Sequence, residues 1–135
     1  LWLDAVIYQT PAWWLEAPAA LKSYEDDVFG GPAMITGDGR HHENPAVNYG
    51  TGGKLKGRYM ISSTWNAPLN AFLAPDEFFE GKGIDATFFG LHKANQFIGL
   101  KPLPSFMCND VIKNPTLESD IERLKAHLEK VFGRA

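Results

Sequence analysis

The chain alternates between short apolar runs and segments in which apolar residues recur at helical spacing. The apolar runs, rich in β-branched and aromatic residues, predict strands over about residues 3–10, 58–63 and 103–109. The periodic segments predict helices over about residues 18–29, 85–97 and 117–132. In the first of these helices Leu21, Tyr24 and Val28 form the expected buried stripe. This alternation predicts an α/β fold, with a mostly parallel sheet and helices on both faces.

Unusual residues follow the first two predicted strands. Trp13 and Trp14 come directly after the first strand, and residues 64–67 (TWNA) follow the second. Right-handed crossovers place these loops at the same edge of the sheet, where open α/β sheets bind ligands. Two indoles, a hydroxyl, an amide and backbone N–H groups suit a flavin ring, which needs a flat apolar wall and fixed donors. The alternative is that the indoles anchor the loop and a subunit contact.

Composition narrows the possible functions. The 135 residues suit one domain, of which 44% is hydrophobic, and the aromatic share of 13% fits a flat-ligand pocket or a subunit interface. A net charge of −3 gives no basic footprint for nucleic acid or an anionic membrane. No apolar run approaches the roughly 20 residues of a membrane span. The single cysteine, Cys108, fits a reducing compartment, so we expect a cytoplasmic protein.

A long irregular segment, residues 31–57, separates the first helix from the second strand. It contains His41, His42 and Glu43, but adjacent histidines on a loop lack the spacing of a metal site, so no metal is predicted. It also contains a glycine cluster at residues 50–53, which follows no strand and opens no helix. We therefore interpret that cluster as a turn and not as a phosphate-binding loop.

Several sequence blocks together resemble one family. They are residues 9–14 (QTPAWW), 17–18 (AP), 22–29 (KSYEDDVF), 64–68 (TWNAP), 92–97 (HKANQF) and 109–113 (NDVIK). The chain resembles the modulator of drug activity B family of NAD(P)H:quinone oxidoreductases, over essentially its whole length. More distantly, residues 9–29 and 58–67 resemble the DT-diaphorases.

The resemblance implies an FAD-dependent homodimer that reduces quinones by two electrons from NADPH or NADH. Hydride would pass through flavin N5 with ping-pong kinetics. The flavin contacts carried over from the family fall on two loops, at Pro11, Ala12, Trp13, Trp14, Leu15, Thr64, Trp65, Asn66 and Ala67. The expected substrate contacts are Trp14, Phe72 and, from a segment that caps the partner subunit's site, Tyr49. Phe72 aligns with a tyrosine that DT-diaphorases use in hydride transfer, and no histidine follows nearby, so no catalytic side chain is assigned.

The resemblance also predicts the place of the chain within the fold. It assigns residues 1–135 to the C-terminal part of a single flavodoxin-like domain, a three-layer sandwich containing strands 3, 4 and 5. Strands 1 and 2 and the phosphate-binding loop would be missing, so we expect this chain alone to fold poorly or to bind no FAD. Two alternatives stay open: a related flavin reductase or azoreductase, and a non-catalytic remnant that retains only the dimer surface.

Overall fold

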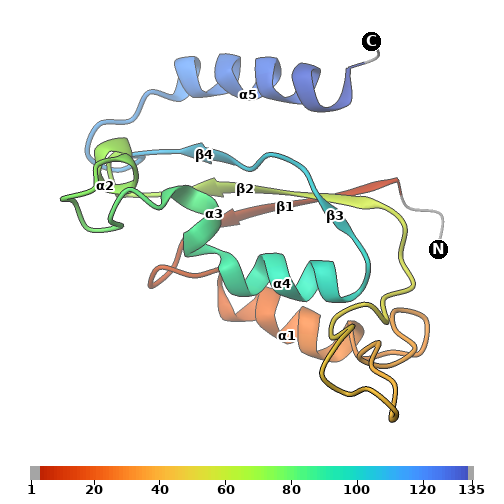
Figure 1. The fold of residues 1–135 in the computed structure, drawn as a ribbon. Helices are drawn as coiled ribbons and strands as arrows, with labels where there is room; N and C mark the ends of the chain where they lie inside the picture. The colour runs from red at the N-terminus through yellow and green to blue at the C-terminus, as the bar shows by residue number, and fades with distance from the viewer. Residues whose placement is uncertain (1–3, 134–135) are drawn as a thin grey trace.

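A parallel sheet forms the middle layer of the computed structural model, which describes residues 4–133 (Figure 1). The strands are β1 (Ala5–Pro11), β2 (Arg58–Thr64), β3 (Lys101–Pro102) and β4 (Phe106–Cys108). The central strand β2 pairs with β1 on one side and with both β3 and β4 on the other, always in parallel. The predicted α/β fold with a parallel sheet is confirmed.

Helices cover both faces of this sheet. The helices α1 (Ala19–Val28) and α4 (Phe89–Phe97) lie on one face, and α5 (Leu117–Phe132) lies on the other (Figure 1). Two short helices, α2 (Leu69–Leu73) and α3 (Gly83–Thr87), connect β2 to α4. No helix within residues 4–133 is both long and apolar enough to cross a membrane.

Two predicted elements differ from their predicted ranges. The helix predicted over residues 85–97 is divided at Phe88, whose φ of −94° and ψ of 29° leave the helical region. Of the strand predicted over residues 103–109, only β4 (Phe106–Cys108) forms, and β3 (Lys101–Pro102) precedes the predicted range. Pro104 lies between these two strands and has no N–H to donate to the sheet. In the first strand, residue 3 of the predicted range lies outside the described residues.

The expected absence of the first two family strands is not supported. A strand already stands in the N-terminal part of the described chain, beginning at Ala5, and it pairs along its full length with β2. The equivalence of these strands to strands 3, 4 and 5 of a larger flavodoxin-like sheet stays a prediction.

The core lies between β2 and the helices that cover one face of the sheet. Five consecutive residues of β2 are buried, and Tyr59, Met60 and Ile61 have no exposed surface. On α1 the buried position is not the expected one. Tyr24 is 49% exposed, whereas Glu25 is only 7% exposed. The helix is rotated so that a carboxyl group, and not the tyrosine ring, faces inward.

The buried carboxyl of Glu25 gives a testable dependence of stability on pH. Burial raises the pKa of Glu25 above its ordinary value. Folding therefore favours the protonated carboxyl, and this contribution to stability is full below the ordinary pKa and is lost as pH rises through the raised pKa. We expect Glu25→Gln to be more stable than the parent at about pH 7, with the difference shrinking toward about pH 4.

Urea unfolding across that pH range measures the difference. The control is Asp27→Asn, because Asp27 lies on the same helix and is exposed. Its difference from the parent should show no comparable trend. The prediction is contradicted if the difference in free energy of unfolding between Glu25→Gln and the parent stays constant with pH.

Candidate functional site

The loops that follow β1 and β2 lie side by side at the carboxyl edge of the sheet. Pro11 stands opposite Thr64 in the strand register, and the N–H of Ala12 donates to the carbonyl of Thr64 at 2.9 Å. Parallel pairing thus continues to the first residues of both loops. The predicted convergence of these two loops is confirmed.

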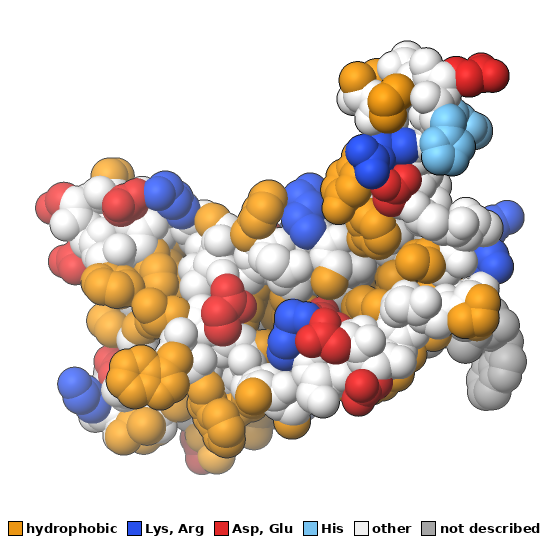
Figure 2. Space-filling view, turned by 90° about the horizontal axis from the view of Figure 1, so that it is seen from below, with side chains coloured by type: hydrophobic (Ala, Val, Ile, Leu, Met, Phe, Trp, Pro, Cys, Tyr) orange, Lys and Arg blue, Asp and Glu red, His pale blue; other side chains and the backbone are white. Residues whose placement is uncertain are grey.

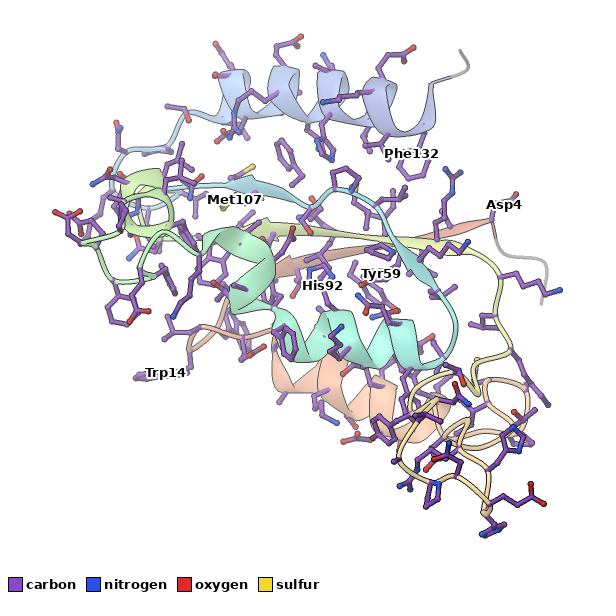
Figure 3. The ribbon with its side chains drawn as sticks, viewed as in Figure 1. Asp4, Trp14, Tyr59, His92, Met107 and Phe132 are labelled. Atoms are coloured by element: carbon purple, nitrogen blue, oxygen red, sulfur yellow. The ribbon has the colours of Figure 1, made fainter. Side chains whose placement is uncertain are left out.

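The loop between β1 and α1 is a tight turn that exposes an indole. Trp13 and Glu16 close it with reciprocal backbone hydrogen bonds of 2.8 and 3.1 Å. Between them Trp14 and Leu15 have φ values of 50° and 69°, in the left-handed region that is uncommon for large side chains. Trp14 is 98% exposed and projects away from the sheet (Figure 3). The turn holds a large aromatic ring in solvent, with almost none of its surface covered by the part of the chain that the structure describes.

Backbone donors accompany this indole. The N–H groups of Trp14, Leu15 and Asn66 donate to no group among residues 4–133. They belong to the two converging loops, so a bound molecule at this edge meets several free donors close to an exposed aromatic face. This donor set suits the flat, hydrogen-bonding ring of a flavin.

The indole of Trp65 has a different environment from those of the first loop. It is 3% exposed, its Nε1–H donates to Ser63 Oγ at 2.9 Å, and its ring meets Phe72 edge-on at 5.0 Å. The backbone N–H of Trp65 is also occupied, because it donates to the carbonyl of Cys108 at 2.9 Å. Trp65 therefore supports the second loop from within the core. The accessible predicted contacts on this loop are the exposed Asn66 and the half-buried Thr64 and Ala67.

A third loop, after β4, braces the second one. The N–H of Asp110 donates to the carbonyl of Ala67 at 3.1 Å, and the Asn109 amide reaches the same carbonyl at 3.4 Å. Asp110 has a φ of 55°. Because β4 runs parallel to β2, this segment lies at the same edge of the sheet, although the sequence analysis assigned it no role. The adjacent Asn and Asp directly after a strand were the available signal, because both residue types favour such turns.

The three predicted substrate contacts lie in different environments. Trp14 is exposed at the carboxyl edge, but Phe72 has no exposed surface and stacks on Phe79 at a centroid distance of 4.2 Å. Tyr49 is 70% exposed and belongs to residues 31–57, which lie toward the opposite end of the sheet (Figure 1). The structure therefore does not bring these three residues together within one chain.

The buried polar residues of α4 do not extend this site. His92 Nδ1 lies 2.8 Å from the Tyr59 hydroxyl, and His92 Nε2 lies 3.2 Å from an Asp85 carboxylate oxygen. His92 and Tyr59 lie between α4 and the sheet (Figure 3), and the hydrogen bond from His92 lowers the pKa of Asp85. His92 is thus a packed histidine. Residues 4–133 contain no group of three or more His, Cys, Asp or Glu side chains able to hold a metal ion.

Comparison with known proteins identifies the family of this chain. The model of the flavodoxin-like fold family matches residues 1–131. The chain belongs to the flavodoxin-like fold family. In this family the loops at the carboxyl ends of the strands, where Trp14 stands, are the expected ligand-binding edge.

Individual relatives refine this assignment. The chain is 51% identical over 136 residues to the NADPH:quinone oxidoreductase MdaB of Haemophilus influenzae, spanning 98% of this chain and 71% of that protein. The resemblance to the modulator of drug activity B family is therefore confirmed. The fold also matches a Klebsiella pneumoniae protein assigned as a quinone reductase (TM-score 0.73, 24% identity), covering 96% of this chain and 49% of that one. A further match is general stress protein 14 of Treponema denticola, in complex with FMN (TM-score 0.63, 14% identity). It covers 94% of this chain and 64% of that one.

Proposed function

We propose that this flavodoxin-like protein reduces quinones with electrons from NADPH or NADH, using a flavin held at the carboxyl edge of its sheet. The observation that carries the proposal is Trp14, which is 98% exposed in a left-handed turn beside free backbone donors. Holding a bulky residue in this backbone region costs free energy, and such strain concentrates at ligand-binding sites. The identity to an NADPH:quinone oxidoreductase supports the same reaction.

Each accessible residue of the two loops has a proposed role. The exposed rings of Trp13 and Trp14 form the apolar wall for the flavin ring, while Pro11, Ala12 and Leu15 shape the turn beneath it. The free N–H groups of the first and second loops bind the polar edge of the ring. A bound flavin, which we take to be FAD, supplies the hydride chemistry between nicotinamide and quinone.

The proposed homodimer accounts for Tyr49. Its ring packs against Phe97 at 5.5 Å, and Arg40 lies 5.6 Å from its centroid, yet 70% of Tyr49 stays exposed. The segment that carries Tyr49 lies away from the carboxyl edge of the sheet in its own subunit (Figure 1). An exposed aromatic residue in such a position is suited to meet a partner subunit. In the proposed dimer, Tyr49 covers the quinone beside the partner's flavin.

Flavin binding tests the proposed site directly. Titration of FAD with the protein, followed by flavin fluorescence, should show saturable binding. The earlier expectation that this chain binds no FAD rested on the absence of the first two family strands, which the paired N-terminal strand does not support. Trp14→Ala should weaken this binding by about tenfold, because aromatic stacking contributes on the order of 1–3 kcal/mol per ring. The matched control is Phe89→Ala, because Phe89 is 61% exposed on α4 and belongs to neither loop. Equal flavin affinity for the parent and Trp14→Ala contradicts the site.

Steady-state kinetics with FAD present tests the reaction. Oxidation of NADPH should be faster with menadione than with an azo dye as acceptor. The reverse order favours an azoreductase, and saturable flavin binding without turnover of either acceptor favours a non-catalytic remnant.

A further inference from the structure

A groove of about 700 Å³ lies between α1 and α4 and reaches Glu16 and Ala17 at the end of the first loop. Figure 2 views the molecule from this side and shows orange apolar side chains between charged ones. The apolar part of the lining includes Leu21, Phe29, Ile35, Leu91, Ala94 and Phe97. Its size and apolar character match pockets that bind small organic molecules.

One buried carboxyl interrupts this apolar lining. Glu25 is 7% exposed, and its Oε1 has no hydrogen-bond partner among residues 4–133. A buried carboxyl oxygen without a partner is costly, so such groups are normally paired. Burial also raises the pKa of Glu25, as expected for a carboxyl that lacks a bound cation. Glu25 belongs to the groove lining, so a rotation of its carboxyl that exposes this oxygen would let the cationic donor of a ligand satisfy it.

The charges along the groove favour a positively charged ligand. Its charged lining consists of Glu16, Lys22, Glu25 and Asp26. Lys22 forms an ion pair with Asp26, one helical turn away, and its charge also acts on Glu25, whose pKa it lowers against the larger effect of burial. With three acids and one lysine among its charged residues, the lining has a net negative charge when Glu25 is ionised. An anionic ligand would therefore be repelled here, whereas a cation would be attracted.

We propose that this groove is a binding site for a small amphipathic cation, with its amine or amidine on Glu25 and its apolar body between α1 and α4. Contact with a cation stabilises the ionised carboxyl, so binding and deprotonation of Glu25 favour each other. The affinity of the groove for the cation therefore falls as pH falls through the pKa of Glu25. The site uses no residue of the proposed flavin wall, so it does not depend on the proposed function.

Three probes of matched shape and different charge test the site. Phenylbutylamine, phenylbutanol and phenylbutyrate share one apolar body, and calorimetric titration at about pH 7 measures their affinities. The amine should bind at least about tenfold more tightly than the alcohol, and the butyrate should not bind measurably. Equal affinity of amine and alcohol overturns the proposal.

Three variants locate the binding. Glu25→Gln should abolish the preference for the amine, whereas Asp27→Asn, on an exposed position of the same helix, should retain it. Ala94→Trp, whose fold is checked by its thermal transition, should fill the groove and weaken both the amine and the alcohol. An amine preference that survives in Glu25→Gln, or undiminished binding to folded Ala94→Trp, places the probe elsewhere and overturns the proposal.

Self-association provides a separate check. If a second copy of the chain covers the groove, amine affinity should disappear at protein concentrations where sedimentation shows a dimer. That outcome assigns the groove to a subunit contact and also overturns the proposal. Unchanged amine affinity in the dimer supports it. Failure of flavin binding affects neither result, because the probes and the flavin are titrated separately.

Discussion

Replacing Phe72 with alanine should lower the free energy of unfolding by about 3–5 kcal/mol, the usual range for a buried aromatic ring. Phe72 has no exposed surface, stacks on Phe79 at 4.2 Å and meets Trp65 edge-on at 5.0 Å. Truncation removes both aromatic contacts and leaves a cavity beneath the second loop. Urea unfolding followed by circular dichroism measures the loss.

A neighbouring phenylalanine provides the matched control. Phe78 is 71% exposed and contacts Phe79 edge-on, so Phe78→Ala should change stability by no more than about 0.5–1 kcal/mol. The two variants make the same chemical change within seven positions of each other, and burial is the main difference between them. Comparable losses in both would show that burial in this aromatic cluster does not determine stability.

The same position also tests the role that the family resemblance implied. A direct substrate contact requires exposed surface, which Phe72 lacks. Phe72→Leu keeps most of the buried volume, so the quinone KM of the FAD-loaded enzyme should change little if Phe72 acts only through packing. A raised KM at nearly unchanged stability would instead restore Phe72 as a substrate contact.

Local patterns predicted most of the fold because the strands and helices are strongly periodic. The run at β2 contains three consecutive apolar residues, Tyr59 to Ile61, and five of its positions are buried. The prediction failed where a single residue decides the backbone path. Phe88 divides one predicted helix, and the last predicted strand is reduced to β4, after Pro104. On α1 the sequence pattern favoured Tyr24 as the buried residue, but Glu25 is buried instead.

The site was predictable in its location and less so in its details. Crossover handedness alone places the loops after β1 and β2 together, and the bond from Ala12 to Thr64 confirms that step. Which tryptophan is exposed could not be predicted from residue type. Trp65 is buried by Phe72, Phe79 and Phe88, which are distant in sequence. The left-handed turn at Trp14 and Leu15 had no signal either, because no glycine or asparagine marks it.

Replacing Gly53 with alanine should cost about 3 kcal/mol or more, because the added methyl group meets backbone and not a flexible side chain. A Cβ at this position would lie 2.2 Å from Gly99 N and 2.2 Å from the carbonyl carbon of Ile98. The backbone at Ile98 cannot shift freely to make room, because its carbonyl accepts a hydrogen bond from the backbone N–H of Leu55 at 3.0 Å. The end of residues 31–57 is thereby packed against the end of α4.

The control for this variant is Gly30→Ala, at a glycine where a Cβ meets no atom within 4 Å. That change should be neutral or stabilising by up to about 1 kcal/mol, because alanine restricts the unfolded chain. Thermal unfolding should separate the two variants by more than about 10 °C, given a few degrees per kcal/mol for a domain of this size. If residues 31–57 were only loosely attached, Gly53→Ala would behave like Gly30→Ala. A large difference instead means that residues 50–57 are anchored to α4. The exposed Tyr49 would then be presented to a partner subunit from a fixed base, rather than from a freely moving loop.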